Sequence, residues 1–228
     1  MNYLRFLALV LLATALAAAD EGSCSVLDDR TSDDPADPAD PAAPFNDNFN
    51  GGLVFWRAAP AAGPGQDVSL GNPLPAMQVG SQALTPTGAV TIRKFDISAG
   101  LIIEADVYTE PPSPPPAAAP AVWVGLSDLD DPTATPALAA GQYIDVGGTI
   151  HFQINGADAG SAAAPATGQW NRLSTTIKAD RTVEFRVNGA LLLTAGTVDA
   201  AHLVRPVKVG GDGYPERPHI DNVSARRP

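Results

Sequence analysis

The sequence predicts an all-β domain over residues 45–228, built as a two-sheet antiparallel sandwich. Short runs of β-branched and aromatic residues alternate with clusters of Gly, Pro, Asn and Asp, which is the pattern of strands and turns. No segment in this region has the 3.6-residue periodicity of an amphipathic helix. About twelve such runs, separated by turn signals, favour two packed sheets.

A predicted signal peptide, residues 1–19, precedes the domain. One cation, Arg5, leads into an apolar stretch that ends in small residues suited to signal peptidase. The stretch is too short for a membrane span of about 20 residues, and no later segment is apolar enough to cross a bilayer. We therefore expect an extracytoplasmic protein, either secreted or associated with the cell envelope.

Cys24 is the only cysteine, so the chain cannot form an internal disulfide and its fold depends on a hydrophobic core. Its position after the apolar stretch also makes it a candidate lipid anchor. Gly22 and Ser23 fit a bacterial lipobox, whereas Glu21 stands where such a box has leucine. Lipidation stays open, and it is the only membrane contact that the sequence suggests.

Residues 20–44 are predicted to be an acidic linker rich in Asp, Pro and Ala, with D-P-A repeated three times. Repeated prolines and mutually repelling acids favour a semi-rigid spacer. The net charge of −11 is unevenly spread: residues 20–47 contribute −8, residues 48–228 contribute −4, and Arg5 contributes +1. No basic patch stands out, which argues against a nucleic-acid partner.

The clearest predicted element is a hairpin over residues 170–194. Apolar and polar residues alternate in 173–177 and again in 183–187, and residues 179–181 turn the chain between these runs. Asn188-Gly189 then predicts a tight type I′ turn, because both of its central residues need a positive φ. The other strands are expected in the runs 53–57, 75–81, 89–97, 101–110, 121–129, 142–148, 149–156, 190–196, 205–211 and 219–227.

The hairpin sequence resembles a known superfamily. G-Q-W-N-R-L followed by T-V-E-F-R-V-N-G is similar to the central hairpin of concanavalin A-like, laminin-G-like jelly-roll domains. D-N-F-N-G-G-L at 47–53 and H-I-D-N-V at 219–223 are similar to the ends of bacterial members. The resemblance covers about residues 45–228 and implies a jelly roll. It does not choose a function, because this fold hosts lectins, glycosidases, lyases and adhesion modules alike.

The pair Glu104 and Asp106 raises the possibility of sugar hydrolysis, since residues two apart on a strand share a face. Laminarinase-type hydrolases of this fold carry E-x-D-x-E, or a bulged form, on one strand. Here Tyr108 and Thr109 stand where the second glutamate belongs, and Glu110 comes one residue too late. A one-residue slip turns a side chain to the other face, so half of the required pair is missing.

A lyase is the second enzymatic alternative. Polysaccharide lyases of this fold usually join a Tyr, a His and an Arg or Gln, and Tyr108, His151, Arg93 and Gln153 would face outward if the alternation holds. No motif fixes their positions. The histidines have no H-x-H or H-E-x-x-H spacing, and there is no G-x-S-x-G elbow.

A binding site is the leading hypothesis, because the outward residues join an aromatic ring to charged groups, as a sugar requires. The alternation places apolar residues inside the sandwich, among them Val90, Ile92, Phe152 and Phe185. Trp123 stands out among the outward residues: it contacts a ligand, or the loop 110–120 covers it, or the predicted phase is off by one residue. The polar residues could equally form a solvated face with cross-strand pairs. The outward set is Arg93, Glu104, Asp106, Tyr108, Trp123, His151, Gln153, Glu184 and Arg186.

Two groups of acids are candidates for a structural calcium ion. Asp128, Asp130 and Asp131 cluster on one predicted loop, and oxygen ligands suit this hard cation. Asp47 and Asp221 lie near the two ends of the domain, whose terminal strands are often adjacent in jelly rolls. In both groups the acids could instead cap turns.

The sequence therefore predicts an exported, surface-tethered, non-catalytic jelly-roll module that binds carbohydrate or another component of the cell envelope. A diverged hydrolase or lyase of the same fold is the first alternative. A structural or adhesive domain that contacts protein is the second.

Overall fold

The computed structural model describes residues 43–58, 64–67, 69–72, 74–79, 87–109, 120–132, 136–211 and 218–228. The predicted signal peptide, Cys24 and nearly all of the predicted linker lie outside these residues, so they stay predictions. Among the described residues, no helix is long and apolar enough to span a membrane.

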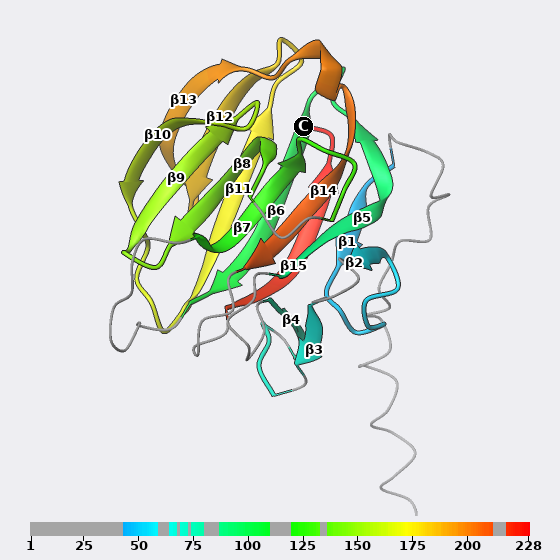
Figure 1. Ribbon diagram of the computed structural model, residues 1–228, viewed down its shortest axis with the longest axis vertical. Helices are drawn as coiled ribbons and strands as arrows, with labels where there is room; N and C mark the ends of the chain where they lie inside the picture. Colours follow the sequence, from blue (N-terminus) through cyan, green and yellow to red (C-terminus); the bar gives the residue numbers. More distant parts are fainter. Residues whose placement is uncertain are drawn as a thin grey trace, which may run out of the picture. The chain divides into compact units, whose positions relative to one another are not determined.

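The strands form two antiparallel sheets (Figure 1). Sheet A has the order β13-β12-β11-β6-β15-β4-β3, with β1 also paired to β15, and sheet B has the order β10-β9-β8-β7-β14-β5-β2. The strands of sheet A are β1 (Phe45–Asp47), β3 (Gly65–Asp67), β4 (Ala76–Gln78), β6 (Leu101–Tyr108), β11 (Trp170–Ile177), β12 (Thr182–Val187), β13 (Ala190–Thr197) and β15 (His219–Arg226). Those of sheet B are β2 (Trp56–Ala58), β5 (Thr87–Asp96), β7 (Pro120–Ser127), β8 (Leu138–Asp145), β9 (Thr149–Ile154), β10 (Ala157–Ala163) and β14 (Val204–Gly211).

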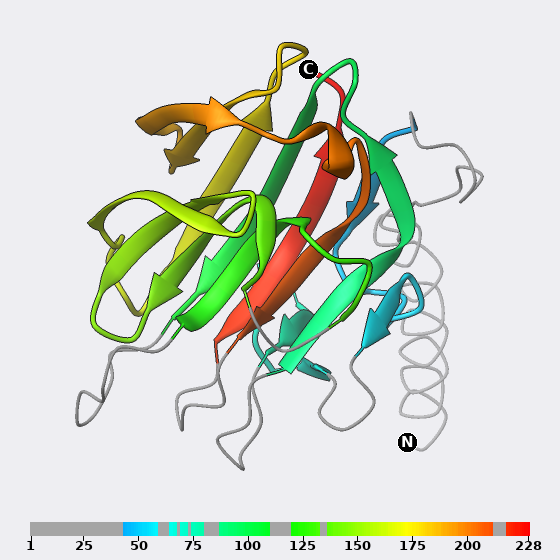
Figure 2. The ribbon, with the colours of Figure 1, turned by 45° about the horizontal axis from the view of Figure 1, so that its top comes forward.

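The sheets lie as two layers, and Figure 2 shows β14 crossing in front of β15. The chain changes sheet between β5 and β6 and again between β6 and β7, and β6 and β7 contact each other across the core. A single short 3-10 helix, η1 (Ala200–His202), interrupts the strands of the described chain. The predicted all-β two-sheet sandwich is confirmed.

The core lies between the sheets, because each strand turns alternate residues inward. On β9 and β12 the burial pattern alternates along the whole strand. Phe152 of β9 stacks on Phe185 of β12, with ring centroids 5.1 Å apart and planes 28° from parallel. Residues buried with them include Phe95, Ile103, Val107, Val124, Leu126, Ile150, Leu173, Val183, Val209 and Ile220.

Two Asn-Gly turns close hairpins at the sheet edges, one at the β13 edge of sheet A and one at the β10 edge of sheet B. Asn188 and Gly189 have φ of 50° and 83°, which confirms the predicted turn between β12 and β13. Asn155 and Gly156, with φ of 54° and 75°, make the same turn between β9 and β10. Sequence reasoning missed β10 because its small side chains, ADAGSAA, have no strand preference of their own.

The predicted phase of β5 is wrong by one residue. Ile92, expected inside, is 61% exposed, whereas Arg93, expected outside, is 2% exposed. Burying Phe95 also turns Arg93 inward, since the two are two apart on the strand. Arg93 is accommodated there by its cation 5.2 Å from the centre of the Phe95 ring, and by hydrogen bonds that it donates to the carbonyls of Ala43 and Pro44.

The Phe152–Phe185 stack provides a test of the core. We expect Phe185→Ala to lower the free energy of unfolding by about 3–5 kcal/mol, because it removes a buried ring and leaves a cavity between the sheets. Leu191→Ala on the neighbouring strand, where the side chain is 48% exposed, should cost about 0.5 kcal/mol or less. Urea denaturation measures both, and equal losses would contradict this assignment of the core.

Candidate functional site

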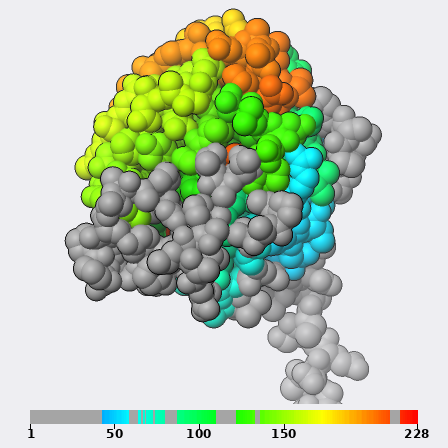
Figure 3. All heavy atoms as spheres, viewed as in Figure 1, coloured from blue at the N-terminus to red at the C-terminus, as the bar shows by residue number. Residues whose placement is uncertain are grey.

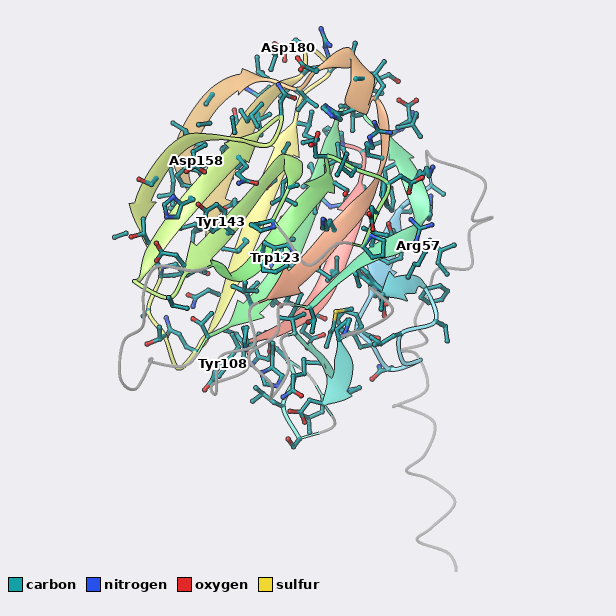
Figure 4. All side chains as sticks on the ribbon, viewed as in Figure 1. Arg57, Tyr108, Trp123, Tyr143, Asp158 and Asp180 are labelled. Carbon is teal, nitrogen blue, oxygen red and sulfur yellow. The ribbon has the colours of Figure 1, made fainter. Side chains whose placement is uncertain are left out.

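A row of side chains crosses the outer face of sheet B. Gly210 of β14 lies opposite Trp123 of β7, which lies opposite Tyr143 of β8, and Tyr143 lies opposite His151 of β9. These residues point away from the core because their neighbours Val122, Val124, Ile144, Ile150 and Phe152 point into it. Figure 4 shows Trp123 and Tyr143 on the neighbouring strands of this sheet.

Tyr143 and His151 form a stacked pair with ring centroids 4.5 Å apart and planes 5° from parallel. A carboxylate lies against each nitrogen of the His151 ring. Nε2 is 3.0 Å from an oxygen of Asp145, and Nδ1 is 3.7 Å from an oxygen of Asp158. Asp145 also accepts the backbone N–H of Thr149 at 2.8 Å, so the turn between β8 and β9 holds this carboxylate in place.

Burial and the two nearby acids both act on Tyr143. Burial raises the pKa of Tyr143, and the nearby charges of Asp158 and Asp145 raise it further. The Tyr143 hydroxyl is hydrogen-bonded to the carboxylate of Asp158. The Asp158 side chain is 54% exposed, whereas that of Asp145 is 11% exposed, so Asp158 is the carboxylate that faces solvent.

The middle of the same face is covered. Trp123 is 1% exposed although it lies outside the main core, and its Nε1 has no hydrogen-bond partner among the described residues. A Cβ added to Gly210 would lie 2.4 Å from the Trp123 ring, so the indole packs directly against the backbone of Gly210. Leu138 covers Gly141 in the same way, with its Cδ1 2.6 Å from where a Cβ would be.

Lys208 belongs to this covered region as well. It lies opposite Gly125 on the outer face of sheet B and is fully buried. Burial lowers its pKa to about 8, against the opposing effect of Asp131 and Asp128. Away from this covered region, the strip formed by β8, β9 and β10 is an accessible part of the face; the yellow-green atoms of this part of the chain lie at the surface in Figure 3.

The residues predicted for one binding face lie on two. Trp123, His151 and Gln153 share the outer face of sheet B, and Gln153 accepts the N–H of Leu138 at 3.3 Å. The other predicted residues of this face lie elsewhere: Tyr108, Glu104, Asp106 and Arg186 are on sheet A, and Arg93 points inward. The loop suggested as a cover for Trp123 lies almost entirely outside the described residues.

Glu104 and Asp106 do share a face, the outer face of sheet A, where both are bound by arginines. Arg172 donates two hydrogen bonds to Asp106, at 2.8 and 3.2 Å, and Arg226 donates one to Glu104 at 3.2 Å. Arg186 is likewise paired, with Glu184 at 3.0 Å. The pairs of Asp106 with Arg172 and of Glu104 with Arg226 join neighbouring strands, whereas Glu184 and Arg186 lie on the same strand, β12.

Tyr108 lies at the end of the same face of sheet A. Its ring centroid is 5.6 Å from that of Trp170 and 6.4 Å from that of His219. The His219 ring is tied to Asp67 of β3 at 2.9 Å. Tyr108 is thus separated from Trp123 and His151 by the whole thickness of the sandwich.

The predicted calcium ligands already have protein partners. Asp130 binds Arg57 and Lys94, and Asp128 lies 2.6 Å from Nε2 of His202. Asp47 accepts the indole N–H of Trp56 at 2.7 Å. Within the described part of the chain, no group of three or more His, Cys, Asp or Glu side chains is arranged to hold a metal ion. A structural calcium ion stays a prediction.

Asp221 is a buried acid with a strongly raised pKa. It is fully buried on β15 directly opposite Asp106, and it accepts the backbone N–H groups of Asn72 and Asn222. Burial raises its pKa to about 6, with repulsion from Asp106 and Asp47 adding to the effect and the two N–H donors opposing it.

Sequence reasoning missed Tyr143, Asp145 and Asp158. A signal for the first two was present: Q-Y-I-D-V alternates polar and apolar residues, and the glycines at 147 and 148 mark a hairpin turn that sets Tyr143 opposite His151. Asp158 could not be found in this way, because it lies on the strand that was missed.

No family model matches the chain, and no curated protein matches it. Among solved structures, the chain is similar to the carbohydrate recognition domain of Emp47p (TM-score 0.58, 11% identity, 76% of this chain and 89% of that one). It is also similar to peanut lectin (0.57, 12%, 80% and 96%) and to the carbohydrate binding module CBM66 from Bacillus subtilis (0.50, 9%, 77% and 97%).

A sialidase is matched with a TM-score of 0.55 at 13% identity, but the match spans only 18% of that chain. At these identities the similarities show the fold, which is the concanavalin A-like sandwich that the hairpin and terminal motifs implied.

The bare backbone beneath Trp123 can be tested. We expect Gly210→Ala to destabilise the protein by about 1–3 kcal/mol, because the new methyl group displaces the indole or the backbone of β5. Gly65→Ala, where nothing lies within 4 Å of the added Cβ, is the matched control and should be close to neutral. Thermal unfolding measures stability, and near-ultraviolet circular dichroism reports the indole. A neutral Gly210→Ala would contradict the described packing of Trp123.

The buried carboxyl of Asp221 predicts a pH effect. Its pKa lies above that of an unfolded aspartate, so between about pH 4 and pH 6 the folded chain keeps a proton that the unfolded chain releases. This contribution favours the folded state at low pH and is lost as the pH rises through about 6, at a cost of up to about 3 kcal/mol.

Asp221→Asn isolates the effect, because other acids such as Asp67, whose pKa is lowered to about 2, act in the opposite sense. We expect the stability of the wild type relative to the variant to fall between about pH 4 and pH 7 in urea denaturation. A difference that does not change with pH would contradict the prediction.

Proposed function

We propose that this protein is a non-catalytic carbohydrate-binding module whose ligand lies against β8, β9 and β10 on the outer face of sheet B. The observation that carries the proposal is the Tyr143–His151 stack with Asp145 and Asp158 beside it. The names of three structurally similar proteins, a carbohydrate recognition domain, a lectin and a carbohydrate binding module, support it.

The chemistry of the strip suits a sugar. A pyranose offers apolar C–H groups and a rim of hydroxyls, and it needs aromatic surface beside fixed hydrogen-bonding groups. The two rings supply the aromatic surface, and Asp158 supplies an exposed acceptor. Because the side chains stand on paired strands and hold one another, little ordering entropy is lost when a ligand binds.

Hydrolysis by the same residues is not supported by the geometry. A glycosidase needs two carboxyl groups with the scissile bond between them. Here the imidazole of His151 occupies the space between Asp145 and Asp158. Glu104 and Asp106 lie on the opposite sheet, where arginines donate hydrogen bonds to both carboxylates.

A surface role is part of the proposal. The predicted signal peptide would export the chain, and the acidic linker of residues 20–44 would hold the module away from its point of attachment. A lipid on Cys24 would make that attachment a membrane, and the carbohydrate would then belong to the cell envelope or its surroundings. Cleavage and lipidation are readable by mass spectrometry of the mature N-terminus.

A docking surface for protein receives less support. The large apolar side chains that are exposed in the described residues are mostly isolated, and only Leu191 and Leu192 are adjacent. Single exposed hydrophobic residues are normal on a soluble protein.

The proposal predicts that substitutions on the outer face of sheet B weaken glycan binding and that substitutions on sheet A do not. On a broad glycan array followed by calorimetry, we expect Tyr143→Ala and His151→Ala each to weaken binding by about tenfold, or about 1.4 kcal/mol, by removing half of the aromatic pair. Trp123→Ala should act through lost packing, so its effect on binding should accompany a loss of stability.

Tyr108→Ala makes the same chemical change on sheet A and should leave binding unchanged. Binding that survives Tyr143→Ala but is lost with Tyr108→Ala would move the site to sheet A. A wild-type protein that binds no glycan, with calcium present, would end the carbohydrate proposal.

A further inference from the structure

The strip that carries the proposed site has an unusual balance of charge. Residues 132–171, which include β8, β9 and β10, contain no lysine or arginine. Their only charged side chains are Asp145 and Asp158, giving a formal charge of −2 with His151 neutral. Both acids lie on the outer face, beside the Tyr143–His151 stack.

The cations elsewhere on this sheet do not offset these acids. Arg57 and Lys94 are both bound to Asp130, at the opposite side of the sheet; Figure 4 shows Arg57 and Asp158 far apart. Lys208 is buried, and the nearby acids are Asp131 and Asp128. The raised pKa of Tyr143 reflects the same negative field, since both aspartates oppose a further negative charge there.

We propose that the site at Tyr143 and His151 takes saccharides that carry a protonated primary amine, in preference to uronic acids or sulfated sugars. The inference rests on the proposed function and names its ligand class. Asp158 is the partner of the ammonium group, because its side chain is 54% exposed, whereas that of Asp145 is 11% exposed and accepts the N–H of Thr149.

An amino sugar matches the strip in two ways. Its ammonium group has three N–H donors for a carboxylate and is attracted to the face of an aromatic ring. Its ring C–H groups pack on Tyr143 as those of a neutral sugar would. An anionic sugar would instead approach two carboxylates with no cation within the strip to receive it.

The experiment compares four ligands by calorimetry with the full chain at about pH 7, where an amine with a pKa of about 7.7–8.0 is mostly protonated and an ordinary imidazole is mostly neutral. The probes are a β-linked glucosamine tetramer, its N-acetylated form, a galacturonic acid tetramer and tetralysine. We expect the glucosamine tetramer to bind up to about fivefold more tightly than the N-acetylated form, as one exposed ion pair allows, and the galacturonate to bind most weakly.

Asp158→Asn should remove the preference for the amine while leaving affinity for the N-acetylated tetramer unchanged. Asp180→Asn is the matched control, an exposed aspartate on the turn between β11 and β12, and should change neither. Raising the salt from about 10 mM to about 1 M, which shortens the Debye length from about 30 Å to about 3 Å, should reduce the preference in the wild type.

The outcomes separate the two proposals. Binding of the N-acetylated tetramer without any preference for the amine would overturn the inference and leave the proposed function standing. Tetralysine binding as tightly as the glucosamine tetramer would also overturn it, because charge alone would then suffice. Binding of no saccharide here or on the glycan array would remove the proposed function itself.

Discussion

The two sheets pack against each other through one face each, and the rest of the structure depends on this constraint. Because side chains alternate along a strand, each residue committed to the core fixes its neighbours on the outer face. Ile144 and Ile150 face inward on β8 and β9, so Tyr143 and His151 face outward as a cross-strand pair. The turn at residues 145–149 sets the register that makes them stack.

Alternation explains which parts of the fold could be predicted from the sequence. The hairpin of β11, β12 and β13 was predicted because its apolar residues alternate strictly and Asn188-Gly189 closes it. In β5 two phases compete, one burying Val90 and Ile92 and the other burying Phe95 and Ile97, and alternation alone cannot choose between them. The structure takes the second phase, and the buried Arg93 lies against the ring of Phe95 and donates to the carbonyl of Pro44, at the N-terminal end of the domain.

The candidate site was only partly predictable for a different reason. Alternation indicates that a residue faces outward, but it does not indicate from which sheet. Tyr108 and Trp123 belong to successive strands, yet β6 pairs with β11 and β15 whereas β7 pairs with β8 and β14. Those pairings join residues far apart in the chain, and no local pattern carries them. His151 and Trp123, which do share a face, were therefore grouped with residues that lie on the other sheet.

The two outer faces differ in whether their acidic side chains are paired with arginines. The proposed ligand site lies on β8, β9 and β10, whose two acids have no arginine partner among the described residues. On sheet A, Asp106 is paired with Arg172, Glu104 with Arg226 and Glu184 with Arg186, so these acids of the face have cationic partners within the chain. On β8, β9 and β10 two carboxylates flank a histidine and a tyrosine, with no lysine or arginine in that stretch of sequence. Like charges that are not compensated within a protein favour a ligand that brings the opposite charge. For the proposed site, the aromatic pair between the carboxylates favours a ligand that also presents an apolar face, so the proposal names a cationic sugar rather than a simple cation.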